Sequence, residues 1–177
     1  MKLLFARLMR VIRLDMTLFE EIITDPKTQG HGYWAVAILA MATGYGMFSR
    51  SGGTAVNIGL AVTFFSWYVW AFTVYYMGTR MFKAVPSRMD RKTVLRVLAF
   101  ACAPGILRVF GIIPGMSLVV YLITSGWIIY IGAYGIKLNF KQERIGPALV
   151  LCTVTWLVVL FLQIFFMILL FSVFGVS

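Results

Sequence analysis

The residue of this sequence best suited to chemistry is an arginine inside an apolar stretch. Only eleven uncharged residues separate Arg96 from Arg108. As a helix they would cover about 16 Å, roughly half of the hydrocarbon thickness of a bilayer. A membrane span that begins near Arg96 must therefore continue past Arg108, which places this arginine within or near the outer part of the membrane.

Pro104 and Gly105 interrupt the same stretch. Proline cannot continue the helical hydrogen bonding, so the carbonyl of Phe100 loses its partner. Broken helices and intramembrane arginines build anion sites in transporters, which makes Arg108, Pro104, Gly105 and Arg96 the candidate functional residues. The alternative is a simple proline kink, with an arginine that extends to the outer interface.

Other reactive groups are scarce. The single histidine, His31, has no reactive neighbour in the sequence, and the apolar stretches hold no carboxylate. Cys102 and Cys152 lie in apolar runs and are expected to pack as reduced thiols. We therefore expect no catalytic set, no metal site and no cofactor.

The amino-acid composition indicates the class of fold that positions these residues. Of the 177 residues, 61% are hydrophobic and 12% are charged, about half the charged fraction of a soluble domain. The sequence therefore predicts an all-α polytopic membrane bundle of residues 31–177, preceded by an amphipathic cytoplasmic-interface segment, residues 1–30. Five stretches are long and apolar enough to cross a bilayer: 33–49, 54–77, 93–113, 116–136 and 147–174.

Basic residues alternate along the predicted spans. Counted around each connection, with Arg96 and Arg108 assigned to the nearer end of the third span, the Lys and Arg residues number five, one, six, one, three and zero. By the positive-inside rule this pattern predicts a cytoplasmic N-terminus and an outer C-terminus. The expected location is a prokaryotic plasma (inner) membrane, with the ER or Golgi membrane as the alternative.

The net charge of +10 also bears on partners. The basic residues lack the interleaved aromatic pattern of a nucleic-acid module, so nucleic acid is not expected. Anionic lipid headgroups of the bilayer are the nearer partner. The expected contacts are Lys83, Arg88, Arg91 and Lys92.

The first two dozen residues are amphipathic and break near Asp15. Thr17 and Glu20 fit a capping box that starts a second short helix, and Asp25-Pro26 ends it. Two arrangements stay open: helices lying along the cytoplasmic leaflet, or a helix packed under the bundle. Small residues inside the spans would let helices approach closely, within the bundle or in a dimer. They are Ala40, Gly44, Gly132, Ala133 and Gly135.

Three stretches resemble the Yip family of multipass proteins, named for binding Ypt/Rab GTPases, and its prokaryotic branch in particular. They are LFEEIITDPKTQGHGYWAVAIL, RKTVLRVLAFACAPGIL and WIIYIGAYGIKLNFKQERIGPALVL. The resemblance covers residues 17–174 and implies five helices, a cytoplasmic N-terminus and a non-enzymatic protein that associates with itself or others. The DLYGP-like motif and longer polar N-terminal region of eukaryotic members are missing, so Rab binding is not carried over.

Two functions follow from these observations. The first is a non-catalytic membrane organiser or adaptor that acts through helix faces and its cytoplasmic surface, as a homo-oligomer or with other membrane proteins. The alternative is a small channel or transporter, for an anion or a lipid, that uses the broken third span and Arg108.

Overall fold

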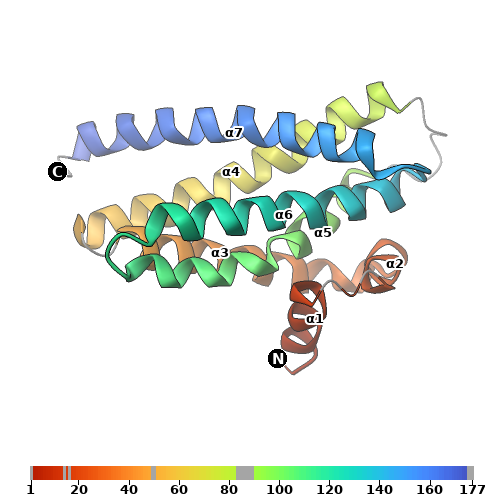
Figure 1. Cartoon of the computed structure of the whole chain (residues 1–177), viewed down its shortest axis with the longest axis horizontal. Coiled ribbons are helices and arrows are strands. Elements are labelled where there is room, and N and C mark those ends of the chain that lie inside the picture. Colours follow the sequence, from red (N-terminus) through yellow and green to blue (C-terminus); the bar gives the residue numbers. More distant parts are fainter. Residues whose placement is uncertain (1, 14, 16, 49–50, 83–89, 175–177) are drawn as a thin grey trace.

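The computed structural model describes residues 2–13, 15, 17–48, 51–82 and 90–174. This part of the chain is helical and contains no β-strand (Figure 1). The predicted all-α bundle is therefore confirmed. Its elements are α1 (Lys2–Ile12), α2 (Thr17–Thr24), η1 (Pro26–Thr28), α3 (Gln29–Phe48), α4 (Gly52–Met81), α5 (Arg91–Ala101), η4 (Ala103–Ile112), α6 (Ser117–Asn139) and α7 (Ile145–Phe174).

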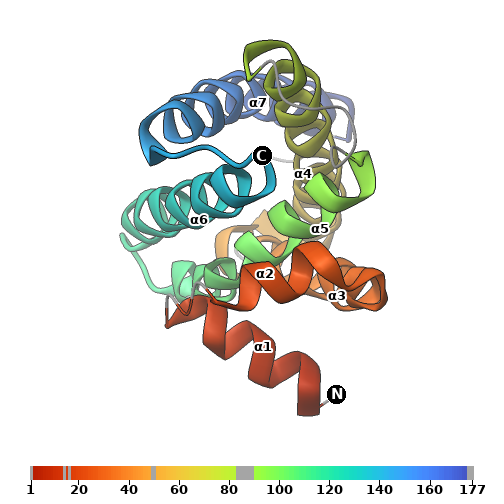
Figure 2. The ribbon, with the colours of Figure 1, turned by 90° about the vertical axis from the view of Figure 1, so that its right-hand side faces the viewer.

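The long helices run side by side along the long axis of the molecule (Figure 1). α3 packs against α4 and η4, and α6 packs against η4, α5 and α7. α7 contacts α4 and α6, and lies on the opposite side of the bundle from α1 and α2 (Figure 2). We call the end of the bundle where α3, α5 and α7 begin the basic end, and the opposite end the distal end.

Three helices, α4, α6 and α7, are long and apolar enough to cross a membrane. A fourth crossing is counted if the bent pair α5 and η4 forms one span. α3 has 20 residues but is not among them, because its glycines and polar residues lower its hydropathy. A membrane crossing by α3, and hence the total of five, stays a prediction.

The helical break at Pro104 is confirmed. α5 ends at Ala101, and η4 continues at an angle of 41° as ten residues of 3₁₀ helix. Such helices rarely run beyond three or four residues. The length of η4 therefore calls for support from neighbouring helices.

α3 supplies this support by packing backbone against backbone. A Cβ on Gly46 would overlap the carbonyl oxygen of Arg108 and lie 2.9 Å from Cα of Val109. Likewise, a Cβ on Gly105 would overlap the side chain of Leu39. Close approach of this kind lets helices gain dispersion energy where lipid supplies no hydrophobic driving force.

The small residues of α6 serve the bundle itself. A Cβ on Gly132 would meet Trp70 at 3.1 Å and Leu98 at 3.2 Å. A Cβ on Gly135 would meet Val97 at 2.5 Å and Phe19 at 2.9 Å. Of the two uses left open by the sequence, these glycines follow the first, packing within the chain.

The two N-terminal helices differ in burial. α2 buries Leu18, Phe19 and Ile22 and contacts α5 and α6, so it packs onto the bundle. α1 lies across the long axis and projects from the bundle (Figure 1), with Leu3 and Phe5 about 60% exposed. The packed arrangement thus holds for α2, whereas α1 keeps an exposed apolar side that suits a membrane interface.

Gly46→Ala is expected to destabilise the protein by about 1–3 kcal/mol, because the added methyl group has no space against η4. Thermal unfolding in detergent measures the effect. Gly126→Ala on α6 is the matched control, since a Cβ there meets nothing within 4 Å. Equal midpoints for the two variants would contradict the close packing of α3 on η4.

Candidate functional site

The guanidinium of Arg108 is enclosed in the bundle, with 4% of the residue exposed. Its Nε donates to Oγ1 of Thr124 at 3.1 Å, and its Nη2 donates to Oγ of Ser125 at 2.9 Å. Its Nη1 donates to Oγ1 of Thr43 at 3.4 Å, and its Cζ lies 4.4 Å from the ring centroid of Tyr121. The side chain therefore turns into the bundle and does not extend to the outer interface.

Helix geometry presents these hydroxyl oxygens to the arginine. The hydroxyl of Thr43 donates to the carbonyl of Leu39, and that of Thr124 donates to the carbonyl of Val120, one turn earlier in each helix. Because the proton is used on the helix, a lone pair of each oxygen is left to accept from Arg108. The guanidinium of Arg108 is therefore held by neutral hydroxyl acceptors.

The described residues supply no counter-charge for Arg108. Every ion pair found among them joins Arg7 or Arg10 to Asp15 or Glu21 at the N-terminus. All six acidic residues of the chain belong to segments at the basic end. An unpaired charge in a low-dielectric interior costs several kcal/mol, and carrying one usually reflects function.

The other three candidate residues contribute to the packing of the bundle. Pro104 lies in the first turn of η4 and Gly105 contacts Leu39, so both shape the segment that carries Arg108. Arg96 is buried and donates to the carbonyl of Ile23 at 3.1 Å, which links α5 to α2. The structure does not bring Arg96 to Arg108.

Two of the four predicted lipid contacts can be placed. Arg91 and Lys92 are exposed at the start of α5. The Arg91 guanidinium donates to the hydroxyl of Tyr68 and lies 5.2 Å from the ring of Phe72. Lys83 and Arg88 fall outside the described residues.

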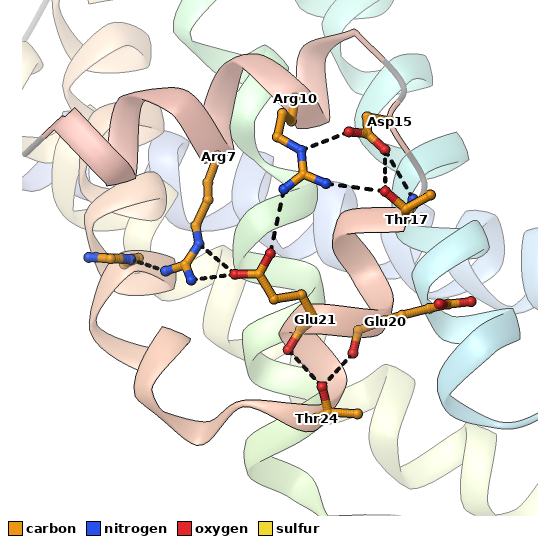
Figure 3. A network of polar contacts seen from close by, with 8 residues as sticks. Arg7, Arg10, Asp15, Thr17, Glu20, Glu21 and Thr24 are labelled. Atoms are coloured by element: carbon orange, nitrogen blue, oxygen red, sulfur yellow. Dashed lines mark hydrogen bonds and ion pairs between the residues drawn. The ribbon is translucent and has the colours of Figure 1, made fainter.

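A second polar cluster joins α1, α2 and α3 at the N-terminus (Figure 3). Arg7 donates to Glu21 through Nε at 3.1 Å and also through Nη2. Arg10 donates to Asp15 at 2.7 Å and to Glu21 at 3.5 Å. The carboxylate of Asp15 accepts from the backbone N–H and the hydroxyl of Thr17, which, together with Arg10, hold the pKa of Asp15 below its usual range.

The capping box expected at Thr17 and Glu20 is thus replaced by a cap from Asp15. Asp15 lies before the first residue of α2, so its carboxylate faces the N–H groups that a helix start leaves unpaired. The expected end of α2 is confirmed, because Asp25 accepts from the N–H of Lys27 at 2.9 Å and caps η1.

His31 belongs to the same cluster. Nη1 of Arg7 lies 2.6 Å from Nδ1 of His31, and arginine can only donate, so Nδ1 must be unprotonated. Burial, followed by the charge of Arg7, lowers the pKa of His31 from its usual 6.5. The neutral imidazole therefore helps to hold α1 on α3.

The sequence analysis missed the hydroxyl residues around Arg108. Their signal was present, since Thr43, Thr124 and Ser125 are polar residues within apolar stretches. What the sequence could not show is that α3 and α6 turn these three side chains toward the same point on η4.

Arg108→Met is expected to change the free energy of unfolding by less than about 1 kcal/mol at low salt. It removes an uncompensated buried charge and keeps most of the volume, and apolar replacements of buried charges are often neutral. Arg7→Met is the contrasting variant. It leaves His31 without its donor and Glu21 with only the 3.5 Å bond from Arg10, and should cost about 1–3 kcal/mol. Denaturation of both variants measures this, and a larger loss for Arg108→Met would make Arg108 a structural residue.

Contact between α1 and α3 is expected to weaken as the pH falls below about 6.5. The pKa of His31 is lowered while α1 is packed on α3 and returns to its usual value when α1 is released. As the pH falls, the released state therefore binds the proton more tightly than the packed state, and acid favours release of α1. Hydrogen exchange of α1 between pH 7.5 and 5.5 measures the release. His31→Gln keeps an acceptor for Arg7 but does not titrate in this range, so its α1 should show no pH dependence. An unchanged dependence in that variant would assign the effect to another group.

Comparison with known proteins places the chain in a family. No curated protein and no solved structure matches it. The sequence model of the Yip1 domain matches residues 11–173, nearly the whole chain, including α2, the break at Pro104 and Arg108. Together with the apolar helices of the bundle, this match identifies an integral membrane protein that belongs to the Yip1 domain family.

Proposed function

We propose that this protein is a non-catalytic organiser or adaptor that assembles with other membrane proteins, or with further copies of itself, through its helix faces. The observation that carries the proposal is the exposure of α7. Of the 18 consecutive residues that are most apolar in each helix, 6% are buried in α7, against 50% in α4 and 56% in α6. The side of α7 that faces away from α4 and α6 is free to contact another protein.

One row of α7 is especially suited to such contact. Phe161, Phe165 and Ile168 are 72%, 55% and 66% exposed, and their spacing of four and three residues places them on one helix face. Large rings on one face supply broad contact area with little loss of side-chain entropy. We take this row as the proposed partner surface.

The basic end supplies the second proposed surface. Arg91 and Lys92 are exposed there, close in sequence to Lys83 and Arg88. Anionic headgroups attract such residues by about 1 kcal/mol each. We propose that this end faces the cytoplasm of a prokaryotic cell, in line with the alternation of basic residues along the chain.

The described residues also bear on the other functional classes. They contain no group of three or more His, Cys, Asp or Glu side chains that could hold a metal ion. We do not propose a channel or transporter, since η4 packs between α3 and α6.

Photo-crosslinking in native membranes tests the partner surface. With a photoreactive phenylalanine analogue at position 161, 165 or 168, discrete protein adducts are expected. Position 166, which lies toward the opposite side of α7 and whose ring contacts Phe65 of α4, should give weaker adducts. Leu122 on α6 is the matched control, because it is 58% exposed but lies on another helix. Lipid adducts alone at all three α7 positions would contradict the organiser function.

A further inference from the structure

The cavity beside Arg108 carries an inference of its own. About 40 Å³ of water-accessible space lies between α4, η4, α6 and α7. One water molecule needs about 10–15 Å³ of such space, so the cavity has room for more than one water molecule. Its polar lining consists of Arg108, Thr63, Ser66, Tyr121 and Gln163, with the indoles of Trp67, Trp70 and Trp156.

Two of these side chains have polar atoms that no other described residue satisfies. The hydroxyl of Thr63 and the indole N–H of Trp67 are buried without a hydrogen-bond partner, and each residue is 4% exposed. Both lie on α4, one turn apart, and both line the cavity. Native proteins rarely leave buried donors unpaired, so something in the cavity is expected to accept from them.

Arg108 has unused donors as well. A guanidinium carries five N–H groups, and the bonds to Thr43, Thr124 and Ser125 use three of them. Two N–H groups are left, on a cation for which the described residues supply no carboxylate.

We infer that this cavity binds a small monovalent anion of halide size, held by Arg108 from η4 and by Trp67 and Thr63 from α4. Arginine and tryptophan can only donate, and a hydroxyl can turn to donate, so the lining suits an acceptor. Water would satisfy the N–H of Trp67, but only an anion also offsets the charge of Arg108. A halide is little larger than a water molecule and fits the volume.

A route to the cavity is visible toward the distal end. A crevice of about 300 Å³ between α3, α6 and α7 is lined by Thr43, Ser117, Tyr121 and Gln163, among others. Tyr121 and Gln163 line both spaces, and Thr43 also accepts from Arg108. We therefore place the entry of the anion at the distal end, opposite α1 and α2. This site does not depend on the proposed organiser function.

Chloride binding to the purified full chain in phosphatidylcholine nanodiscs tests the inference. Broadening of the chloride NMR line, and the rise of the unfolding midpoint when chloride replaces gluconate at equal ionic strength, are both expected to saturate. Arg108→Met should abolish both effects. Arg144→Met, which removes an exposed arginine at the basic end, is the matched control and should leave both unchanged.

Two milder variants keep the test valid if Arg108→Met fails to fold. Thr63→Val and Trp67→Phe each remove one donor and keep the charge, and each should weaken chloride binding about tenfold. Equal chloride effects in the native protein and all three variants would overturn the site. So would stabilisation by phosphatidylglycerol nanodiscs without any effect of chloride, which would assign Arg108 to a lipid phosphate.

Discussion

Lipid offers no hydrogen-bond partner to the polypeptide backbone, so a broken membrane helix depends on its neighbours. Here the chain changes direction after α5 ends at Ala101 and continues as the long 3₁₀ segment η4. Gly46 allows the backbone of α3 to lie directly against η4, and α6 packs on η4 as well. This support holds η4 in place and thereby determines where Arg108 lies.

The chain places two arginine-centred clusters in opposite electrostatic settings. At the N-terminus, Arg7 and Arg10 are paired with carboxylates and fasten α1 and α2 together. In the bundle, the described residues that contact the Arg108 guanidinium offer it neutral hydroxyls and a ring. The role of the first cluster is to hold these two helices together. The second carries a charge that its surroundings do not balance, which is why we assign it a ligand.

Exposure divides the helices by role. α5 is buried along most of its length, whereas α7 and the tip of α1 present large apolar side chains outward. In a membrane such faces are covered by lipid or by another protein, and packing quality decides between them, because hydrophobicity alone does not favour either. The proposed organiser function rests on these faces.

The sequence by itself determined the class, the family and the positions of the five long helical stretches. Apolar length and proline chemistry are local properties, so each predicted stretch lies within four residues of the observed helix ends and the break occurs beside Pro104. Arg108 was also identified, since a charge in an apolar stretch is visible without a fold. Its environment was not, because Thr43, Thr63, Trp67 and Thr124 belong to three other helices. Only the packing of those helices, set by close contacts such as that of Gly46 on η4, decided that they surround one guanidinium.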